Sequence, residues 1–332
     1  MRRVVIALCA VLASFIAGPD AAHAECSYNA QFDPCAVQDG HYRIRTPGTG
    51  GPYPTLVYFY GSVGTSDRYV ESKRFQDQIV GRGYALLVPA ALSMTFSSQD
   101  GDRYRGGGWN LRHPRYRTGR DDVAFVGRVL DDAKRRFNID RSNLVFVGQS
   151  HGGMFLWDIA CHTPRMARAY AIHGASHGGE LPTRCSNPVR FLQTHGRRDD
   201  IVPFKGERRS GKSLINADIS EGLALLGRTN RCRTGPEDVG RLGPYARSTW
   251  RGCAPGSSLD FLAHGGGHGY PGNWITTVLD WYEDGFDAAA DGAASGATVR
   301  PRFNSAQDRG SRFKGVDSRD GARFQRPKAP DS

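Results

Sequence analysis

Short apolar segments rich in β-branched and aromatic residues alternate along this chain with stretches whose apolar residues recur at helical spacing. The segments expected to form buried strands are Thr55–Tyr60, Tyr84–Val88, Asn143–Val147, Arg168–Ile172, Val189–Thr194 and Ser258–Ala263. The stretches expected to form helices are Tyr69–Val80, Asp121–Phe137, Met154–Ala160, Ser213–Leu226 and Trp274–Tyr282. Strands that alternate with helices favour a parallel sheet covered by helices on both faces. We therefore predict an α/β fold, built as a single domain on a mostly parallel sheet.

The beginning of the chain has the three parts of a secretory signal peptide. Two arginines follow Met1, the apolar run Val4–Ile16 comes next, and the motif AHA at residues 22–24 offers small residues for cleavage before Glu25. The apolar run is shorter than the roughly 20 residues that a membrane span needs. We expect residues 1–24 to be removed and the protein to be secreted or periplasmic.

Residues 287–332 are dominated by Ala, Gly, Ser, Asp and Arg and contain few aliphatic side chains that could form a core. We expect a disordered tail there and a folded domain over residues 25–286. The formal net charge is +11, of which +5 lies in residues 297–332 and +1 in the first 20 residues. The remaining excess is modest for a domain of this size, so it does not indicate nucleic-acid binding. The basic tail favours at most a weak association with anionic polymers of the cell envelope.

Removal of the signal peptide would take away one of the seven cysteines and leave six. An even number of cysteines in an exported chain indicates disulfides, and six cysteines allow 15 pairings. Metal binding is a weaker alternative, because no two of the six are two to four residues apart. Pairing in sequence order would join Cys26 to Cys35, Cys161 to Cys185 and Cys232 to Cys253.

The strand expected at Asn143–Val147 is followed by the residues GQSHG (148–152), a G-x-S-x-G motif that leads into an apolar stretch of helical character. In this motif a sharp turn between strand and helix exposes the serine hydroxyl, and the glycines avoid collisions with neighbouring backbone. A second match surrounds Ser176, but it leads into GELP (179–182), which cannot continue as a helix. We therefore assign the nucleophile to Ser150 rather than to Ser176.

A serine nucleophile needs a general base and a carboxylate that orients the base, and both residue types follow later strands. The fifth expected strand leads into HGRRDDIVP (195–203), where Asp199 or Asp200 would lie just beyond the sheet. The last expected strand leads into HGGGHGYPG (264–272), which contains His264 and His268. Serine, acid and histidine occur in this order in one hydrolase fold with a parallel sheet. Taken singly, each aspartate could equally well be a turn cap, and each histidine could equally well be an ordinary loop residue.

Together these motifs resemble the secreted polyhydroxybutyrate depolymerase and feruloyl-esterase-like family of α/β-hydrolases. The resemblance covers most of residues 55–286 and rests on DDVAF (121–125), GQSHGGM (148–154), HGRRDDIVP (195–203) and NRC (230–232), with a cysteine at position 253 ahead of GGGHGYPG (265–272). It implies the α/β-hydrolase fold, with Ser150 as the nucleophile, Asp199 as the acid and His268 as the base. It also implies a disulfide between Cys232 and Cys253.

The resemblance also implies what surrounds these three residues. Backbone N–H groups of His151 and of Ser62, which follows the first expected strand, would hold the oxyanion. Trp109 and Tyr270 are candidates for the substrate pocket. Tyr270 stands where the family usually has Trp, and Tyr60 stands where it usually has His.

The expected function is that of a monomeric secreted serine esterase, which cleaves carboxylic esters through a Ser-His-Asp triad and an acyl-enzyme. The expected substrates are soluble oligomers of hydroxyacids or aryl esters of the feruloyl type. A peptidase or acyltransferase on the same fold, and an inactive envelope-binding protein that uses the basic tail, are the alternatives. No cofactor is expected, and no metal, because the spacing gives His173 and His177 no third ligand.

Overall fold

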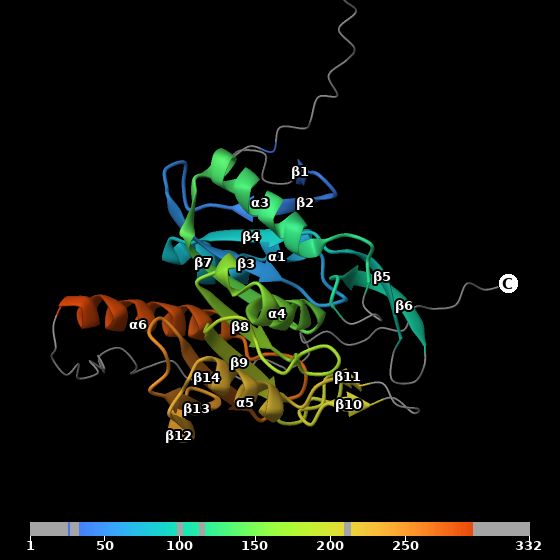
Figure 1. The fold of residues 1–332 in the computed structure, drawn as a ribbon. Coiled ribbons are helices and arrows are strands. Elements are labelled where there is room, and N and C mark those ends of the chain that lie inside the picture. Colours follow the sequence, from blue (N-terminus) through green and yellow to red (C-terminus); the bar gives the residue numbers. More distant parts are fainter. Residues whose placement is uncertain (1–25, 27–32, 98–101, 113–116, 209–213, 295–332) are drawn as a thin grey trace, which may run out of the picture.

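One large sheet runs through the middle of the molecule (Figure 1). The computed structural model describes residues 26, 33–97, 102–112, 117–208 and 214–294. Within these residues, ten strands form the sheet in the order β1-β2-β4-β3-β7-β8-β9-β14-β13-β12. The expected signal peptide and residues 295–332 of the expected tail lie outside the described residues.

The central strands of the sheet are parallel, as the sequence predicts. They are β4 (Ala85–Pro89), β3 (Tyr53–Phe59), β7 (Ile139–Gln149), β8 (Ala169–His173), β9 (Arg190–Gly196) and β14 (Ser258–His264). Every residue of β4 and β8 is buried. Burial on both faces explains why these strands lack the polar alternation of a half-exposed strand.

Antiparallel strands extend the sheet at both edges, and their mixed or exposed side chains give no strand pattern in the sequence. At the β4 edge lie β2 (Gly40–Arg45) and β1 (Cys35–Val37), and at the β14 edge lie β13 (Tyr245–Arg251) and β12 (Thr234–Leu242). Two small hairpins stand apart from the sheet: β5 (Leu92–Ser97) with β6 (Arg103–Gly108), and β10 (Glu207–Arg208) with β11 (Leu214–Asn216).

Helices cover both faces of the sheet, as predicted. In β9, Gln193 accepts a hydrogen bond of 3.1 Å from the indole of Trp157 on α4 (His151–His162). The next residue, Thr194, accepts one of 3.1 Å from the indole of Trp274 on α6 (Trp274–Ala294). Consecutive side chains of a strand point to opposite faces, so α4 and α6 lie on opposite sides of the sheet. Helix α3 (Asp122–Phe137) lies on the same side as α4, toward the viewer in Figure 1.

Two of the expected helices begin or divide where a polar residue caps a helix. The helix expected over Tyr69–Val80 is two helices, α1 (Ser66–Val70) and α2 (Lys73–Ile79), with the short turn η1 (Val80–Arg82) after them. The break falls at Ser72, whose extended backbone and side chain cap the second helix.

The helix expected over Ser213–Leu226 is wrong at its start. Leu214–Asn216 is strand β11, and α5 (Ile219–Thr229) begins only after Asp218, whose side chain accepts a hydrogen bond of 2.7 Å from the Ser220 N–H. Elsewhere in the chain, the short turn η2 (Pro164–Met166) follows the C-terminal end of α4 and leads into β8.

Helix α6 extends past residue 286, the expected end of the domain. Helix α6 continues to Ala294, so residues 287–294, which were expected to belong to the tail, are helical. Among the residues that the structure describes, no helix combines the length and the apolar character needed to cross a membrane.

The three disulfides join the cysteines in sequence order, which confirms the expected pairing. The first joins Cys26 to β1, the second joins α4 to the segment before β9, and the third joins the segment after α5 to the segment after β13. The pairs are Cys26–Cys35, Cys161–Cys185 and Cys232–Cys253.

Candidate active site

The order in which strands are added to the sheet reverses at β3. Strand β4, which follows β3 in the sequence, lies on one side of it, and β7 lies on the other. Ligands of open α/β sheets bind at such a switch point, beyond the carboxyl ends of the strands. Ser62 follows β3 and Ser150 follows β7. The fold therefore brings the expected nucleophile and one expected oxyanion residue to the place where a ligand would bind.

Ser150 forms the whole turn between β7 and α4. Its backbone has φ 52° and ψ −126°, a conformation that residues with a side chain rarely adopt. Its N–H donates a hydrogen bond of 3.0 Å to the His173 carbonyl, and its carbonyl accepts one of 2.9 Å from the Met154 N–H. Strained backbone held by its surroundings in this way is characteristic of functional residues, and it is the geometry of a nucleophile elbow.

The glycines around Ser150 are needed because other backbone approaches them closely. A Cβ atom added at Gly152 would lie 2.2 Å from the carbonyl oxygen of Phe59 in β3. One added at Gly148 would lie 2.9 Å from the Gly152 carbonyl oxygen, and one at Gly61 would lie 2.9 Å from the Cβ of Ser150. These close approaches are the physical basis of the G-x-S-x-G motif here, and they place Gly61 and Ser62 beside the elbow.

The second G-x-S-x-G match does not form an elbow. The chain after Ser176 continues as loop rather than helix, and Ser176 is only 1% exposed. Gly174 in that motif instead borders the ring of His268, because an added Cβ would lie 3.2 Å from its Nδ1. The geometry thus favours Ser150, as the sequence predicts.

Asp199 and His268 meet at the same edge of the sheet. The Nδ1 of His268 lies 2.9 Å from Oδ2 and 3.1 Å from Oδ1 of Asp199. Asp199 Oδ1 also accepts hydrogen bonds from the N–H groups of Ile201 and Val202, at 3.0 and 2.9 Å. Because an ionised carboxylate only accepts hydrogen bonds, the proton of the neutral imidazole lies on Nδ1. The Nε2 of His268 is then the nitrogen that can accept a proton.

The protonation state of Asp199 follows from its neighbours. Burial alone would raise the pKa of this carboxyl, but the hydrogen bond and charge of His268, the Val202 N–H and the charge of His195 outweigh it and lower the pKa. His195 lies 3.3 Å from Asp199 Oδ2 and donates through Nε2 to the Val202 carbonyl at 2.9 Å. His195 thus braces the turn that carries Asp199. The four-residue spacing between the two is its only signal in the sequence.

The structure also distinguishes the expected acid and base from the alternative residues in the same two loops. His264 Nδ1 accepts a hydrogen bond of 3.1 Å from the Gly266 N–H, and its ring stacks on His173 with 5.3 Å between centroids. His264 is therefore occupied in the turn, whereas His268 is the histidine in contact with the acid. Asp200 is exposed, whereas Asp199 is buried.

Buried His173 connects the elbow to the loop of His268. Its carbonyl accepts from the Ser150 N–H, and its Nε2 donates to the His268 carbonyl at 3.2 Å. Burial, followed by the charges of neighbouring histidines, lowers the pKa of His173 far below its ordinary value. A neutral His173 therefore joins the two loops that carry the expected nucleophile and base.

The two expected oxyanion residues lie beside the elbow and are anchored by the β5–β6 hairpin. His151 is the first residue of α4, and its buried Nδ1 accepts a hydrogen bond of 3.2 Å from the Trp109 N–H. Ser62 accepts one of 2.9 Å at its carbonyl from the Gly107 N–H. Ser62 Oγ also lies 3.1 Å from the hydroxyl of Tyr104.

The His151 side chain predicts how stability depends on pH. Burial lowers its pKa to about 3, whereas in the unfolded chain it is about 6.5. As the pH falls below about 6.5, the unfolded state takes up a proton that the folded state refuses, so stability present above that pH is lost. Between pH 7 and pH 5 we expect His151 alone to lower the free energy of unfolding by about 2 kcal/mol.

Urea titrations at the two pH values check this expectation. In the variant His151→Gln, whose side-chain oxygen can still accept from the Trp109 N–H, the loss of stability on acidification should be smaller by about 2 kcal/mol. An equal loss in wild type and variant would contradict a neutral buried His151.

The two residues expected to line the substrate pocket differ in exposure. Trp109 is fully buried, stacks on Phe155 with 5.3 Å between centroids, and donates from its indole to the Tyr60 carbonyl at 3.0 Å. The assignment of Trp109 to the pocket surface is therefore wrong: its indole supports the end of β3. Tyr270 is partly exposed and packs on Trp274 with 4.7 Å between centroids, so it remains a candidate.

A buried ion pair that the sequence does not reveal holds the loop of Trp109 in place. The guanidinium of Arg120 donates to Asp122 Oδ1 at 2.6 Å and to the Ala90 carbonyl at 3.0 Å. Asp122 Oδ2 in turn accepts from the Asn110 N–H at 2.5 Å. Asp122 is part of the DDVAF motif, which thus has a structural role behind the elbow.

Comparison with known proteins gives both sequence relatives and a fold. No defined protein family matches the chain. Feruloyl esterase C of Emericella nidulans is 27% identical over 158 residues, which cover 46% of this chain and 51% of that esterase. A probable feruloyl esterase C of Aspergillus niger is 22% identical over 240 residues, or 70% of this chain and 77% of the relative. The chain thus spans about half the length of the first of these relatives.

Among solved structures, the acetyl xylan esterase from Aspergillus awamori matches with a TM-score of 0.50 over 76% of this chain and 98% of that one. The two chains are 14% identical, so the likeness concerns the fold alone. It agrees with the mostly parallel sheet covered by helices on both faces. The expected α/β-hydrolase fold is confirmed.

Proposed function

We propose that this protein is a serine hydrolase of carboxylic esters, with Ser150 as nucleophile, His268 as base and Asp199 as the acid that orients it. The observation that carries the proposal is the contact between Asp199 and the Nδ1 of His268, at 2.9 Å. This pair lies at the sheet edge where Ser150 occupies its strained turn, with His173 and Gly174 between them. The similarity to curated feruloyl esterases supports the same conclusion.

The proposed roles of these three residues imply an order of proton transfers. His268 Nε2 takes the proton of Ser150 as the serine oxygen attacks the ester carbonyl, and Asp199 stabilises the resulting imidazolium. The imidazolium then gives its proton to the departing alcohol, which leaves an acyl group on Ser150. Water, deprotonated by His268, releases the acid and restores the serine. Backbone N–H groups of His151 and Ser62 are proposed to hold the oxyanion.

The proposed substrates are aryl esters of the feruloyl type, because the sequence relatives carry that name. Oligomers of hydroxyacids are the second substrate class to be tested, on the resemblance of the sequence motifs. We also propose that the protein is exported. Three disulfides, together with the signal-like first 24 residues, fit an oxidising compartment.

A panel of substrates tests the proposal. We expect kcat/KM for methyl ferulate and short p-nitrophenyl esters to exceed that for hydroxybutyrate oligomers by at least about tenfold, the effect of roughly 1.4 kcal/mol in transition-state binding. A peptide amide with the same acyl group serves as control and should not be cleaved. Cleavage of the amide without any ester hydrolysis would replace the esterase with a peptidase, and preference for the oligomers would overturn the aryl-ester assignment.

A further inference from the structure

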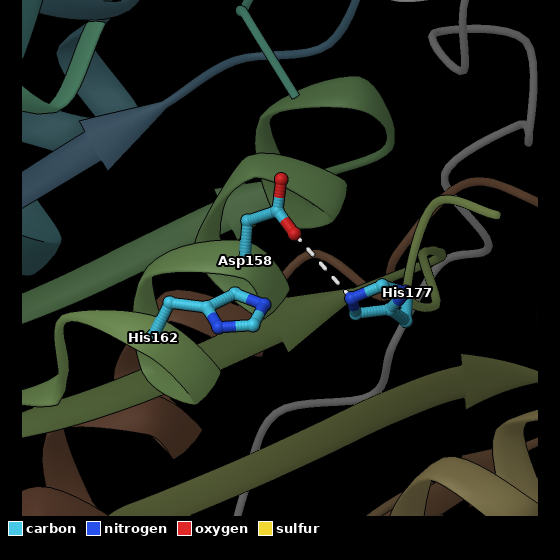
Figure 2. A group of neighbouring side chains, drawn as sticks. All are labelled: Asp158, His162 and His177. Atoms are coloured by element: carbon cyan, nitrogen blue, oxygen red, sulfur yellow. Dashed lines mark ion pairs between the residues drawn. The ribbon is translucent and has the colours of Figure 1, made fainter. Parts of the chain in front are cut away.

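Three side chains that could bind a metal ion converge between α4 and the loop that follows β8. Asp158 and His162 lie four residues apart on α4, and His177 faces them from the loop, as Figure 2 shows. One ligand atom from each residue lies within 4.8 Å of the other two. Residues four apart on a helix share one face, so α4 directs both of its ligands to the same point.

Two of these residues are buried and have unsatisfied polar atoms. Asp158 is 8% exposed and His177 is 6% exposed. Neither Asp158 Oδ1 nor either ring nitrogen of His177 makes a hydrogen bond within the described residues. Buried polar atoms nearly always have a hydrogen-bond partner, whereas Asp158 Oδ1 and His177 Nε2 have only their mutual contact at 3.4 Å, which Figure 2 marks.

The distance between the two side chains fits a shared ion better than a direct hydrogen bond. His177 Nε2 lies 3.4 Å from Asp158 Oδ1, beyond the usual range of an N–H···O bond. Zn²⁺ binds imidazole nitrogen and carboxylate oxygen at about 2.0–2.2 Å in a tetrahedron, which places two ligand atoms about 3.4 Å apart.

The surroundings also suit a metal. Asp158 Oδ2 accepts a hydrogen bond of 2.7 Å from the Arg112 N–H, which orients the carboxylate and leaves Oδ1 available. His162 is partly exposed, which allows a water molecule to complete the tetrahedron.

We propose that Asp158, His162 and His177 bind one divalent transition-metal ion of the zinc type. The sequence suggested His173 and His177 as a pair without a third ligand. In the fold His173 instead bonds to the loop of His268, and the partners of His177 come from α4. The ion fastens α4, the helix that follows Ser150, to the loop that begins at Gly174, and so it stabilises the site without taking part in the reaction.

Metal titration of the untagged, chelator-treated protein tests this site. We expect Zn²⁺ to bind with a stoichiometry of one in calorimetry, and Co²⁺ to give the intense visible absorption of a tetrahedral complex. At a hundredfold excess of Zn²⁺ over its Kd, the Tm should rise by about 5 °C. His162→Ala should weaken binding by about a hundredfold or more and remove the cobalt spectrum. Asp158→Asn should also weaken Zn²⁺ binding.

The control His41→Ala removes a partly buried histidine from β2, far from the cluster in the sequence, and should leave binding unchanged. The variant His268→Ala separates this site from zinc bound at the proposed catalytic histidine, and it should also retain one equivalent. Circular dichroism of each metal-free variant verifies its fold. The proposal is overturned if wild type binds no Zn²⁺, if His162→Ala and Asp158→Asn both bind as wild type does, or if His268→Ala abolishes binding.

Discussion

Replacing Ser150 with alanine is expected to lower kcat by about 10⁵–10⁶-fold on any ester that the wild-type protein hydrolyses. The variant lacks the only atom that can form the acyl-enzyme in the proposed mechanism, while His268 and Asp199 remain. Alanine has no hydroxyl and fits where serine fits, so the strained turn and the fold should persist. Steady-state kinetics on the best ester of the panel measure the loss, and circular dichroism checks the fold.

The matched control is Ser176→Ala, because Ser176 lies at the centre of the same five-residue pattern. Its hydroxyl is buried at 1% exposure and makes no hydrogen bond within the described residues. We expect its kcat to change by less than about threefold, since removal of an unpaired hydroxyl is nearly neutral. A large loss of kcat in Ser176→Ala together with little change in Ser150→Ala would show that Ser150 is not the nucleophile.

Changing Asp199 to asparagine is expected to lower kcat by about 10⁴-fold. The asparagine amide can donate to Nδ1 of His268, which moves the imidazole proton to Nε2 and leaves no lone pair for the Ser150 proton. The loss should lie in kcat rather than KM, because Asp199 is buried and acts through the histidine. Asp200→Asn, at the exposed neighbouring position, is the control and should change kcat by less than about threefold. Equal activity of both variants and wild type would remove Asp199 from the triad.

The sequence is most informative about the centre of the sheet. Strands such as β4 and β8 are buried on both faces, so their apolar runs identify them without any knowledge of their partners. The edge strand β12 (Thr234–Leu242) is largely exposed and contains two glycines and a proline, so its pairing with β13 depends on contacts that no local pattern encodes. The same holds for β11, where strand pairing replaces an expected helical turn.

The candidate site also has a part that the local sequence predicts and a part that it does not. The strand before Ser150 and the helix after it make the elbow predictable from local sequence. The choice of Asp199 over Asp200 and of His268 over His264 required the family resemblance, because both members of each pair lie in one loop. Trp109 was misplaced because a glycine-rich loop gives no sign of whether its tryptophan is covered by other segments.

The proposed metal site shows what residue spacing alone does not predict. Asp158 and His162 have the four-residue spacing of helical ligands, but His177 joins them only because β8 lies beside β7. His195 is a similar case, since its contact with Asp199 depends on the turn at Val202. Contacts between separate loops are set by the order of strands in the sheet, and that order is a property of the whole fold.

Covalent labelling tests the central claim most directly. The intact protein is treated with a fluorophosphonate, which phosphonylates an activated serine, and the modified peptide is identified by mass spectrometry. The account predicts one adduct per molecule, on Ser150, and strongly reduced labelling of the Asp199→Asn and His268→Ala variants. An adduct on Ser176, or the absence of any adduct on the folded protein, would contradict it.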